Sequence, residues 1–168
     1  MLMQIVTHTP TWVWGLLAAL IALGMSQAVT RRMSLVRVTV LPLVLLVLSL
    51  AGVLSTFPHT IVPLATWAVG LLVALVSGRG LVRPRGAHWD TGSASFHVPG
   101  SWLPLALILA LFMLKYAVGV ALALQPGLGR ELGFDAAVGA AYGLFSGLFL
   151  ARTASLWQLA RAPRAIAA

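Results

Sequence analysis

Lys115 is the most chemically unusual residue in this sequence. It stands in FMLKYAVGV, residues 112–120, inside a run from Ser101 to Gln125 that has no other charge. A lysine at the middle of a membrane helix costs roughly 2.5–3.5 kcal/mol on insertion scales, so such residues usually meet a partner or a cavity. Helical side chains lean toward the helix N-terminus, which points this amine away from the nearer membrane surface. We interpret Lys115 either as the mark of a polar cavity or as a structural lysine bonded to carbonyls.

Tyr142 and Ser146 are the predicted neighbours of this amine. An antiparallel hairpin of the last two apolar segments would bring both to the depth of Lys115, one turn apart on the same face. Asp135 is the nearest carboxylate in the sequence, but it would be displaced by roughly 12 Å along the helix axis. The spacing therefore predicts an intramembrane polar site of Lys115, Tyr142 and Ser146.

The four histidines and three carboxylates form no recognised catalytic motif. There is no HExxH, no nucleophile elbow and no phosphate-cradling loop, so we predict no catalytic residue and no cofactor. Whether the protein is an enzyme is left open, with a non-enzymatic role favoured. His8 and His59 are expected near the outer surface and are weak metal candidates, since with Met1 and Met3 they could bind a soft metal such as copper. Loop histidines without a metal are the alternative.

Gly139, Gly143 and Gly147 recur every four residues in AVGAAYGLFSGLF. Two overlapping GxxxG units of this kind let another helix approach closely. We predict helix packing along this stripe, either inside one chain or as the seam of a homodimer.

The overall composition indicates a membrane protein of one domain. The chain has 168 residues, of which 60% are hydrophobic and only 8% charged, whereas soluble proteins average roughly a quarter charged residues. The net charge of +8 comes from short arginine clusters between apolar segments and forms no continuous basic face, so nucleic acid is not an expected partner. The lipid bilayer is the expected partner instead. With no cysteine, disulfides and thiolate sites are excluded.

Five apolar segments are long enough to be predicted as transmembrane helices in an all-α protein. The first lacks a basic n-region before it, so we expect a retained helix rather than a cleaved signal peptide. The five helices are predicted at about residues 11–29, 38–54, 61–77, 102–124 and 134–151.

The distribution of arginine predicts the orientation of these helices. Nine arginines fall in alternate connections and the C-terminal tail, whereas the intervening connections contain only Arg130. Because cytoplasmic loops are enriched in basic residues, the N-terminus is predicted outside and the C-terminus in the cytoplasm.

The longest loop, residues 78–100, is predicted to be cytoplasmic. His88 and Asp90 stand two apart, and Asp90-Thr91-Gly92 is a turn signal before His97. A short β-hairpin against the membrane surface and an irregular loop are both compatible with this pattern. The grouping of two histidines and an aspartate is read as solvated loop polarity.

Three stretches carry a resemblance to a known family. HTPTWVWGLLAALIALG, VPGSWLPLALILALFMLKYAVGVALAL and AAYGLFSGLFLARTASLW resemble a family of small bacterial inner-membrane proteins known mainly as a domain of unknown function. The resemblance spans essentially the whole chain and implies a five-helix protein of the bacterial inner membrane. It also implies that the segment around Lys115 and Tyr116 belongs to the family pattern, but it transfers no catalytic residue.

Together these features predict a small multi-pass inner-membrane protein that binds or passes a small solute near Lys115. An accessory or assembly subunit of a membrane complex is the first alternative, with a homo-oligomer or a membrane protein as partner. A membrane-embedded redox or metal-binding protein is the second.

Overall fold

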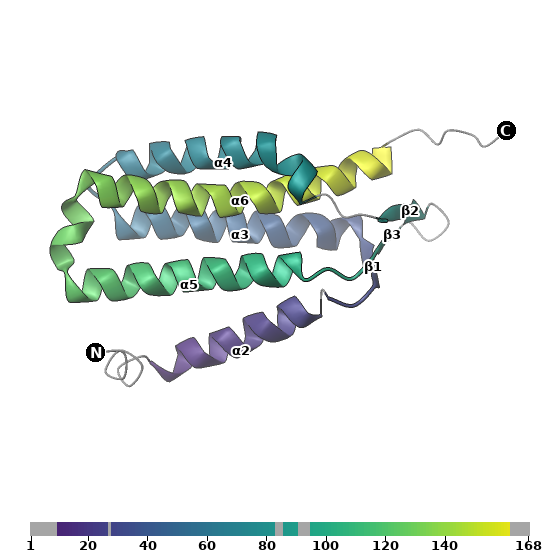
Figure 1. Ribbon diagram of the computed structural model, residues 1–168, viewed down its shortest axis with the longest axis horizontal. Coiled ribbons are helices and arrows are strands. Elements are labelled where there is room, and N and C mark those ends of the chain that lie inside the picture. Colours follow the sequence, from purple (N-terminus) through teal and green to yellow (C-terminus); the bar gives the residue numbers. More distant parts are fainter. Residues whose placement is uncertain (1–9, 27, 83–85, 91–94, 162–168) are drawn as a thin grey trace.

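The computed structural model describes residues 10–26, 28–82, 86–90 and 95–161 of the chain. Within these residues the fold is a helical bundle with short strands gathered at one end (Figure 1). The α-helices are α2 (Thr11–Met25), α3 (Leu35–Thr56), α4 (Val62–Leu81), α5 (Leu103–Leu124) and α6 (Leu132–Arg161). The strands are β1 (Arg31–Ser34), β2 (His88–Asp90) and β3 (Ser95–Val98), and a 3-10 helix, η1 (Pro126–Arg130), joins α5 to α6.

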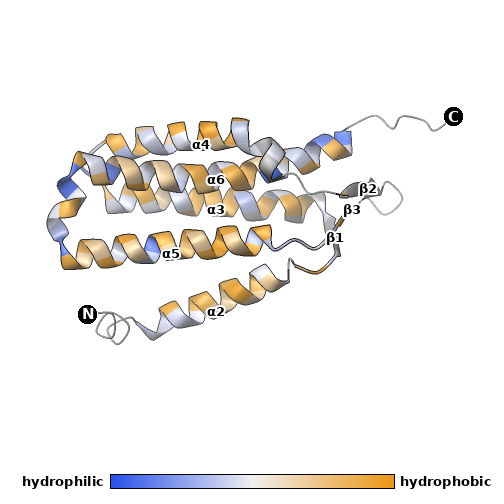
Figure 2. Ribbon diagram, viewed as in Figure 1, coloured by the Kyte–Doolittle hydropathy of each residue, from blue (hydrophilic) through white to orange (hydrophobic). Residues whose placement is uncertain are grey.

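Three of the described helices are long and apolar enough to cross a membrane. These segments are Val38–Thr56, Leu103–Leu124 and Leu132–Leu159. The other two apolar helices of the predicted five are shorter by this measure, at Thr11–Met25 and Val62–Gly78. Figure 2 shows that hydrophobic residues dominate the length of the helices, with the more hydrophilic residues concentrated toward the two ends of the bundle.

A hydroxyl side chain sets the start of both α4 and α5. Thr60 Oγ1 accepts a hydrogen bond from the Val62 backbone N–H at 3.3 Å, and Ser101 Oγ accepts one from Leu103 N–H at 3.3 Å. Each helix has a proline in its first two positions, where the missing N–H is not needed for the helical ladder. The local sequence therefore fixes where these helices begin.

The proline inside α3 leaves one carbonyl without its usual helical donor. Pro42 has no N–H, so the carbonyl of Val38, four residues earlier, loses its i+4 partner. Thr153 of α6 lies near this carbonyl, with Oγ1 3.4 Å from the Val38 oxygen and 3.1 Å from the Phe149 oxygen of its own helix. A side chain from α6 thus reaches the backbone group that Pro42 frees.

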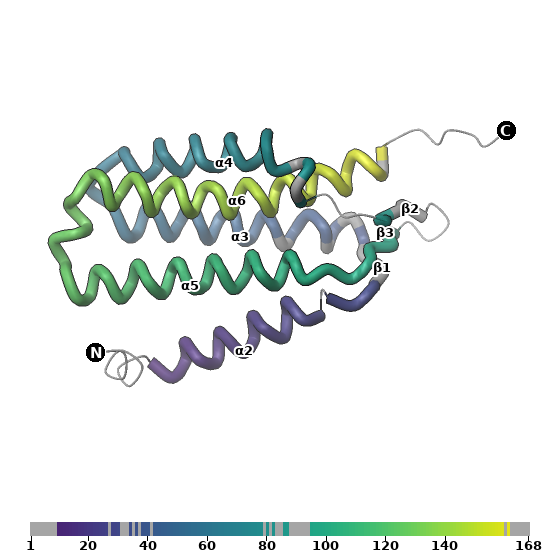
Figure 3. Tube along the Cα trace, viewed as in Figure 1, coloured from purple at the N-terminus to yellow at the C-terminus, as the bar shows by residue number. Residues whose placement is uncertain are grey.

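Helices α4 and α6 lie side by side and run parallel (Figure 3). The glycine stripe of α6, which is Gly139, Gly143 and Gly147, faces α4 along this contact. A Cβ atom added at Gly139 would collide with the carbonyl of Pro63, and one added at Gly147 with the carbonyl of Leu71. The partner positions rise along both helices in the same order, which is the signature of parallel packing.

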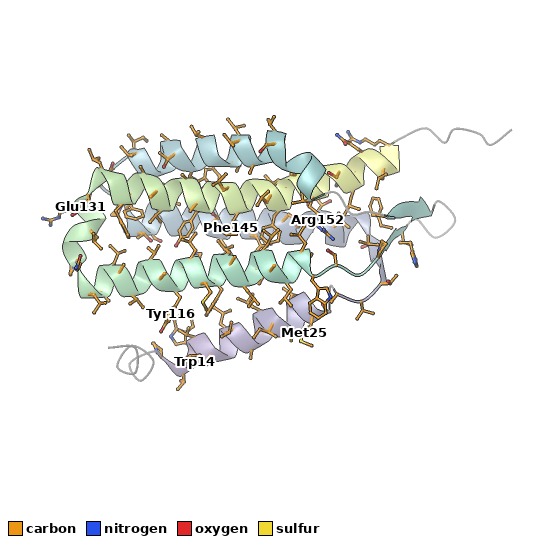
Figure 4. The ribbon with its side chains drawn as sticks, viewed as in Figure 1. Trp14, Met25, Tyr116, Glu131, Phe145 and Arg152 are labelled. Carbon is orange, nitrogen blue, oxygen red and sulfur yellow. The ribbon has the colours of Figure 1, made fainter. Side chains whose placement is uncertain are left out.

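Helix α2 packs against α5 at the edge of the bundle. Its Gly24 is buried, and a Cβ there would collide with the side chain of Leu105 on α5. Figure 4 shows Tyr116 extending from α5 toward α2, where Trp14 lies. The helix ends at Met25, four residues before the predicted end, because the chain then turns toward β1.

The three strands form one antiparallel sheet in the order β1–β3–β2. The strand β1 comes from the connection between α2 and α3, for which no strand was predicted. Phe96 of β3 is fully buried, and together with Val98 it packs against Val38 and Leu156 from the ends of α3 and α6. The turn predicted between β2 and β3 falls at residues 91–94, outside the described residues.

The last helix continues ten residues beyond the predicted end of its membrane span, to Arg161. Trp157 explains part of this extension, since its Nε1 donates a hydrogen bond to Thr39 Oγ1 of α3 at 2.9 Å. The Arg161 guanidinium lies 5.1 Å from the centre of the Trp157 ring, a cation–π distance. The end of α6 is therefore held against the same end of α3.

Candidate functional site

Lys115 lies on the face of α5 that approaches α3 and α6. Its Nζ atom is 5.4 Å from the centre of the Tyr142 ring on α6, within the range of a cation–π interaction. The residue as a whole is exposed at the surface of the chain. The structure thus brings Lys115 and Tyr142 together, with the lysine stem on the surface of the bundle and its ammonium directed at the ring.

Gly52 of α3 provides the space that the ammonium occupies. A Cβ atom at this position would lie 2.9 Å from Lys115 Nζ, closer than real Cβ contacts allow. The carbonyl of Gly52 already accepts hydrogen bonds from Ser55 Oγ at 3.1 Å and Thr56 Oγ1 at 2.8 Å. The glycine therefore admits the lysine head, while two hydroxyls occupy its carbonyl oxygen.

A chain of hydrogen bonds joins three helices next to this position. Trp67 Nε1 of α4 donates to Ser49 Oγ of α3 at 3.1 Å, and Ser49 Oγ donates to the Tyr142 carbonyl of α6 at 3.4 Å. Ser146 Oγ donates to the same carbonyl at 2.9 Å. Ser49, Tyr142 and Ser146 are all at most 4% exposed. The Tyr142 carbonyl is therefore bonded by hydroxyls of α3 and α6, and Trp67 of α4 holds the α3 hydroxyl.

Ser146 differs in role from its predicted one. Its hydroxyl is directed to the Tyr142 carbonyl of its own helix, one turn earlier, so it supports the tyrosine rather than meeting the lysine. In the part of the chain that the structure describes, the ammonium of Lys115 meets the Tyr142 ring and has neither a hydrogen-bond acceptor nor a carboxylate. The site can therefore receive an acceptor group from outside the chain.

Asp135 does not pair with Lys115. It lies in the first turn of α6, two turns before Tyr142, and is 1% exposed. Its Oδ1 atom has no hydrogen-bond partner. The apolar cluster that contains Val53, Val118 and Val138 lies at the same end of the bundle.

The predicted metal candidates do not converge in the described residues. His59 is exposed in the connection before α4, while His8 lies outside the described part of the chain. Among the described residues no group of three or more histidine, cysteine, aspartate or glutamate side chains is placed to hold a metal ion. His88 of β2 is paired directly with His97 of β3, and Asp90 stands opposite Ser95.

The glycine stripe of α6 is filled by α4 of the same chain. A Cβ at Gly143 would lie 2.8 Å from the carbonyl carbon of Trp67 and 2.9 Å from the nitrogen of Leu71. Gly70 of α4 meets Ala140 of α6 in the same close manner. In this arrangement the stripe is not exposed to a second copy of the chain.

Sequence reasoning missed the contributions of α3 and α4 to this site. Ser49, Gly52 and Thr56 are small or polar residues spaced three and four apart in an otherwise apolar helix, which places them on one face. That spacing was the available signal. Nothing comparable marked Trp67, because an indole in an apolar helix is common.

Comparison with known proteins supports the family resemblance. A family model described as "Family of unknown function (DUF6622)" matches residues 1–168. "Uncharacterized protein PM0739" of Pasteurella multocida (strain Pm70) is 34% identical over 73 residues, which cover 44% of this chain and 56% of that protein. No solved structure matches. Because the family model covers the whole sequence, the chain belongs to the DUF6622 family of unknown function.

Proposed function

We propose that this chain is a bacterial inner-membrane protein of five spans that binds a small carboxylate-bearing solute between Lys115 and Tyr142. The observation that carries the proposal is the ammonium of Lys115, which meets the face of an aromatic ring and no acceptor within the described residues. A charge at that depth is unfavourable without a partner. A carboxylate arriving from the exposed side of the lysine supplies one.

The distribution of charge along the bundle supports the five-span topology. Glu131, from the connection predicted to lie outside, is at one end of the bundle, and Arg152, from the arginine-rich set predicted to be cytoplasmic, lies in the opposite half (Figure 4). The shortest helix, α2, has 15 residues and is about 22 Å long, less than the roughly 30 Å hydrocarbon core. Local bilayer thinning, together with Trp12 and Trp14 in the first turn of the helix, accommodates such a mismatch at modest cost.

Single cysteines test the topology without interference, because the chain contains none of its own. We expect His59→Cys to react with a membrane-impermeant maleimide added outside spheroplasts. Thr91→Cys should react only after permeabilisation. Both should react fully in detergent, which controls for local accessibility. The opposite pattern, or equal labelling of both in intact spheroplasts, would show that the proposed orientation is wrong.

Benzoate is a suitable first probe of the solute site, because it combines a carboxylate with an aromatic ring that enters apolar surroundings. A ligand at a hundred times its Kd stabilises the folded state by about 2.7 kcal/mol. We expect benzoate to raise the melting temperature of the protein in nanodiscs. Benzyl alcohol, which has the same ring without the charge, should have a smaller effect.

Two substitutions at Lys115 separate specific binding from a general effect of the probe. Lys115→Met keeps the stem and removes the charge, so the benzoate shift should disappear. Lys115→Arg keeps the charge, so it should retain part of the benzoate-induced rise in melting temperature. If benzoate and benzyl alcohol stabilise equally, or if Lys115→Met responds as the wild type does, the solute site is excluded.

The exposure of Lys115 also favours a second candidate function, that of an assembly subunit. A carboxylate on a membrane helix of another protein could reach the exposed side of this lysine. In that case Lys115→Met would release a partner that co-purifies with the wild type in mild detergent, and benzoate would have no effect on the purified chain.

A further inference from the structure

Asp135 is a buried acid that the proposed solute site does not use. Its side chain is 1% exposed, and its Oδ1 atom has no hydrogen-bond partner. Buried carboxylates that serve a structural purpose are normally paired or hydrogen-bonded, because an unsatisfied buried oxygen is unfavourable. An apolar side chain of similar size would stabilise the fold more than this unpaired carboxyl does.

The surroundings of Asp135 contain few groups that could neutralise it. Along the chain the neighbouring titratable groups are Glu131, which lies just before α6 and is exposed, and Tyr142, two turns later on α6. From η1, which packs against α6, the cation is Arg130, which is exposed. From α5 it is Lys115, whose ammonium lies over the Tyr142 ring. His59, in the connection before α4, is exposed.

The remaining contacts at this end of the bundle are apolar or uncharged. Gly139, one turn after the acid, packs on Pro63 and Thr66 of α4. Phe134, beside it, meets the ring of Phe57 edge-on, with centroids 6.3 Å apart. No described cation lies within ion-pair distance of the Asp135 carboxyl.

We propose that Asp135 is a proton-binding site whose occupancy is coupled to the charge at Lys115. A proton removes the charge from the buried acid without requiring a partner side chain. The position in the first turn of α6 lets the helix N-terminus stabilise the anion when the proton leaves. The acid can therefore exist in both states within the same fold.

The coupling follows from the distance between the two groups. Asp135 precedes Tyr142 by seven residues on α6, which is roughly 10 Å of helical rise, and the ammonium sits over the tyrosine ring. At an effective dielectric constant of about 20, unit charges at this separation alter each other's equilibria on the order of tenfold. An anion bound at Lys115 cancels that influence, so solute binding favours proton uptake at Asp135. This part of the inference depends on the proposed solute site.

Dicyclohexylcarbodiimide tests the proton site directly, because this apolar reagent reacts with protonated carboxyl groups in apolar surroundings. We expect mass spectrometry of the full chain in nanodiscs to locate one adduct on Asp135, with labelling that falls as the pH rises. Asp135→Asn, which keeps the shape, should lose the adduct and keep its melting temperature. Glu131→Gln, which removes the exposed acid one turn away, should label as the wild type does.

The coupling is tested by the same labelling in other conditions. At one pH where labelling is partial, Lys115→Met should label more than the wild type, and benzoate should increase wild-type labelling. Absence of an adduct on Asp135, labelling independent of pH, or identical labelling of Lys115→Met would overturn the inference. So would suppression by Na⁺ at constant ionic strength, since the acid would then bind a metal cation.

The same data distinguish this inference from the solute site. If Lys115→Met changes the labelling and benzoate does not, the coupled proton site stands and the carboxylate-binding function fails. If benzoate stabilises the protein and Asp135 carries no adduct, the carboxylate-binding function stands and the proton site fails.

Discussion

Replacing Gly143 with alanine should loosen the contact between α4 and α6. The added Cβ would sit 2.8 Å from the carbonyl carbon of Trp67 and 2.9 Å from the nitrogen of Leu71, and it would collide with the Trp67 oxygen. All three atoms belong to the backbone of α4, so no side chain can rotate away. Ordinary van der Waals contact begins near 3.4 Å, and the two helices must therefore separate by more than half an ångström.

Two opposing terms determine the size of the effect. Alanine is favoured over glycine inside a helix by about 1 kcal/mol. Overpacking typically costs about 1–3 kcal/mol, and the upper part of that range applies because the obstruction is backbone. The net result is a loss of about 1–2 kcal/mol in the free energy of unfolding.

Gly119 provides a matched control in α5. It is also a helical glycine, but a Cβ added there meets nothing within 4 Å. Gly119→Ala should therefore gain about 0.5–1 kcal/mol from helix propensity alone. The two variants should differ by roughly 1.5–3 kcal/mol, or about 3–12 °C in melting temperature for a chain of this size.

Thermal unfolding in nanodiscs, followed by far-ultraviolet circular dichroism, measures this difference. Both variants must be compared at the same lipid composition, because the bilayer itself affects helix association. If Gly143→Ala melts at or above the temperature of Gly119→Ala, the close backbone contact between α4 and α6 does not exist as described.

Three further predictions concern the hydrogen bonds and the lysine position. Trp67→Phe should lower the free energy of unfolding by about 0.5–1.5 kcal/mol. In the double variant Ser49→Ala should add only the loss of its long bond to the Tyr142 carbonyl, because Trp67→Phe already removes the bond that the two side chains share. Gly52→Ala should weaken the benzoate-induced rise in melting temperature by displacing the Lys115 ammonium, whereas the temperature without benzoate should change less. Thr153→Val should also cost about 0.5–1.5 kcal/mol, measured by thermal unfolding. That cost should shrink when the proline of α3 is replaced by alanine, whose N–H restores the helical bond.

Much of the arrangement around Lys115 was predictable from spacing. Helical rise alone put Tyr142 at the depth of the lysine and displaced Asp135 along the axis. In the structure the ammonium lies over the Tyr142 ring, and Oδ1 of Asp135 has no hydrogen-bond partner. The role of Ser146 differed because a serine in a helix readily donates to the carbonyl one turn earlier.

The partners contributed by α3 and α4 could not be read from any local pattern. Gly52 matters because of what approaches it, and Trp67 because its Nε1 meets Ser49 across a helix boundary. Such contacts depend on which helices are neighbours. The sheet also depends on a contact between distant parts of the sequence, since β1 pairs with a strand more than sixty residues later in the chain.

By itself, the sequence of this DUF6622 chain determined the apolar helices, most of their boundaries and the segregation of charge between their connections. These properties follow from composition and from hydroxyl and proline residues acting within a few positions. Only the tertiary structure decided that the glycine stripe packs against α4 of the same chain. It also decided that the lysine ammonium meets an aromatic ring, whereas Oδ1 of the buried aspartate has no hydrogen-bond partner. The physical reason is that a membrane helix presents apolar side chains on every face, so hydrophobic periodicity does not specify which face meets which neighbour.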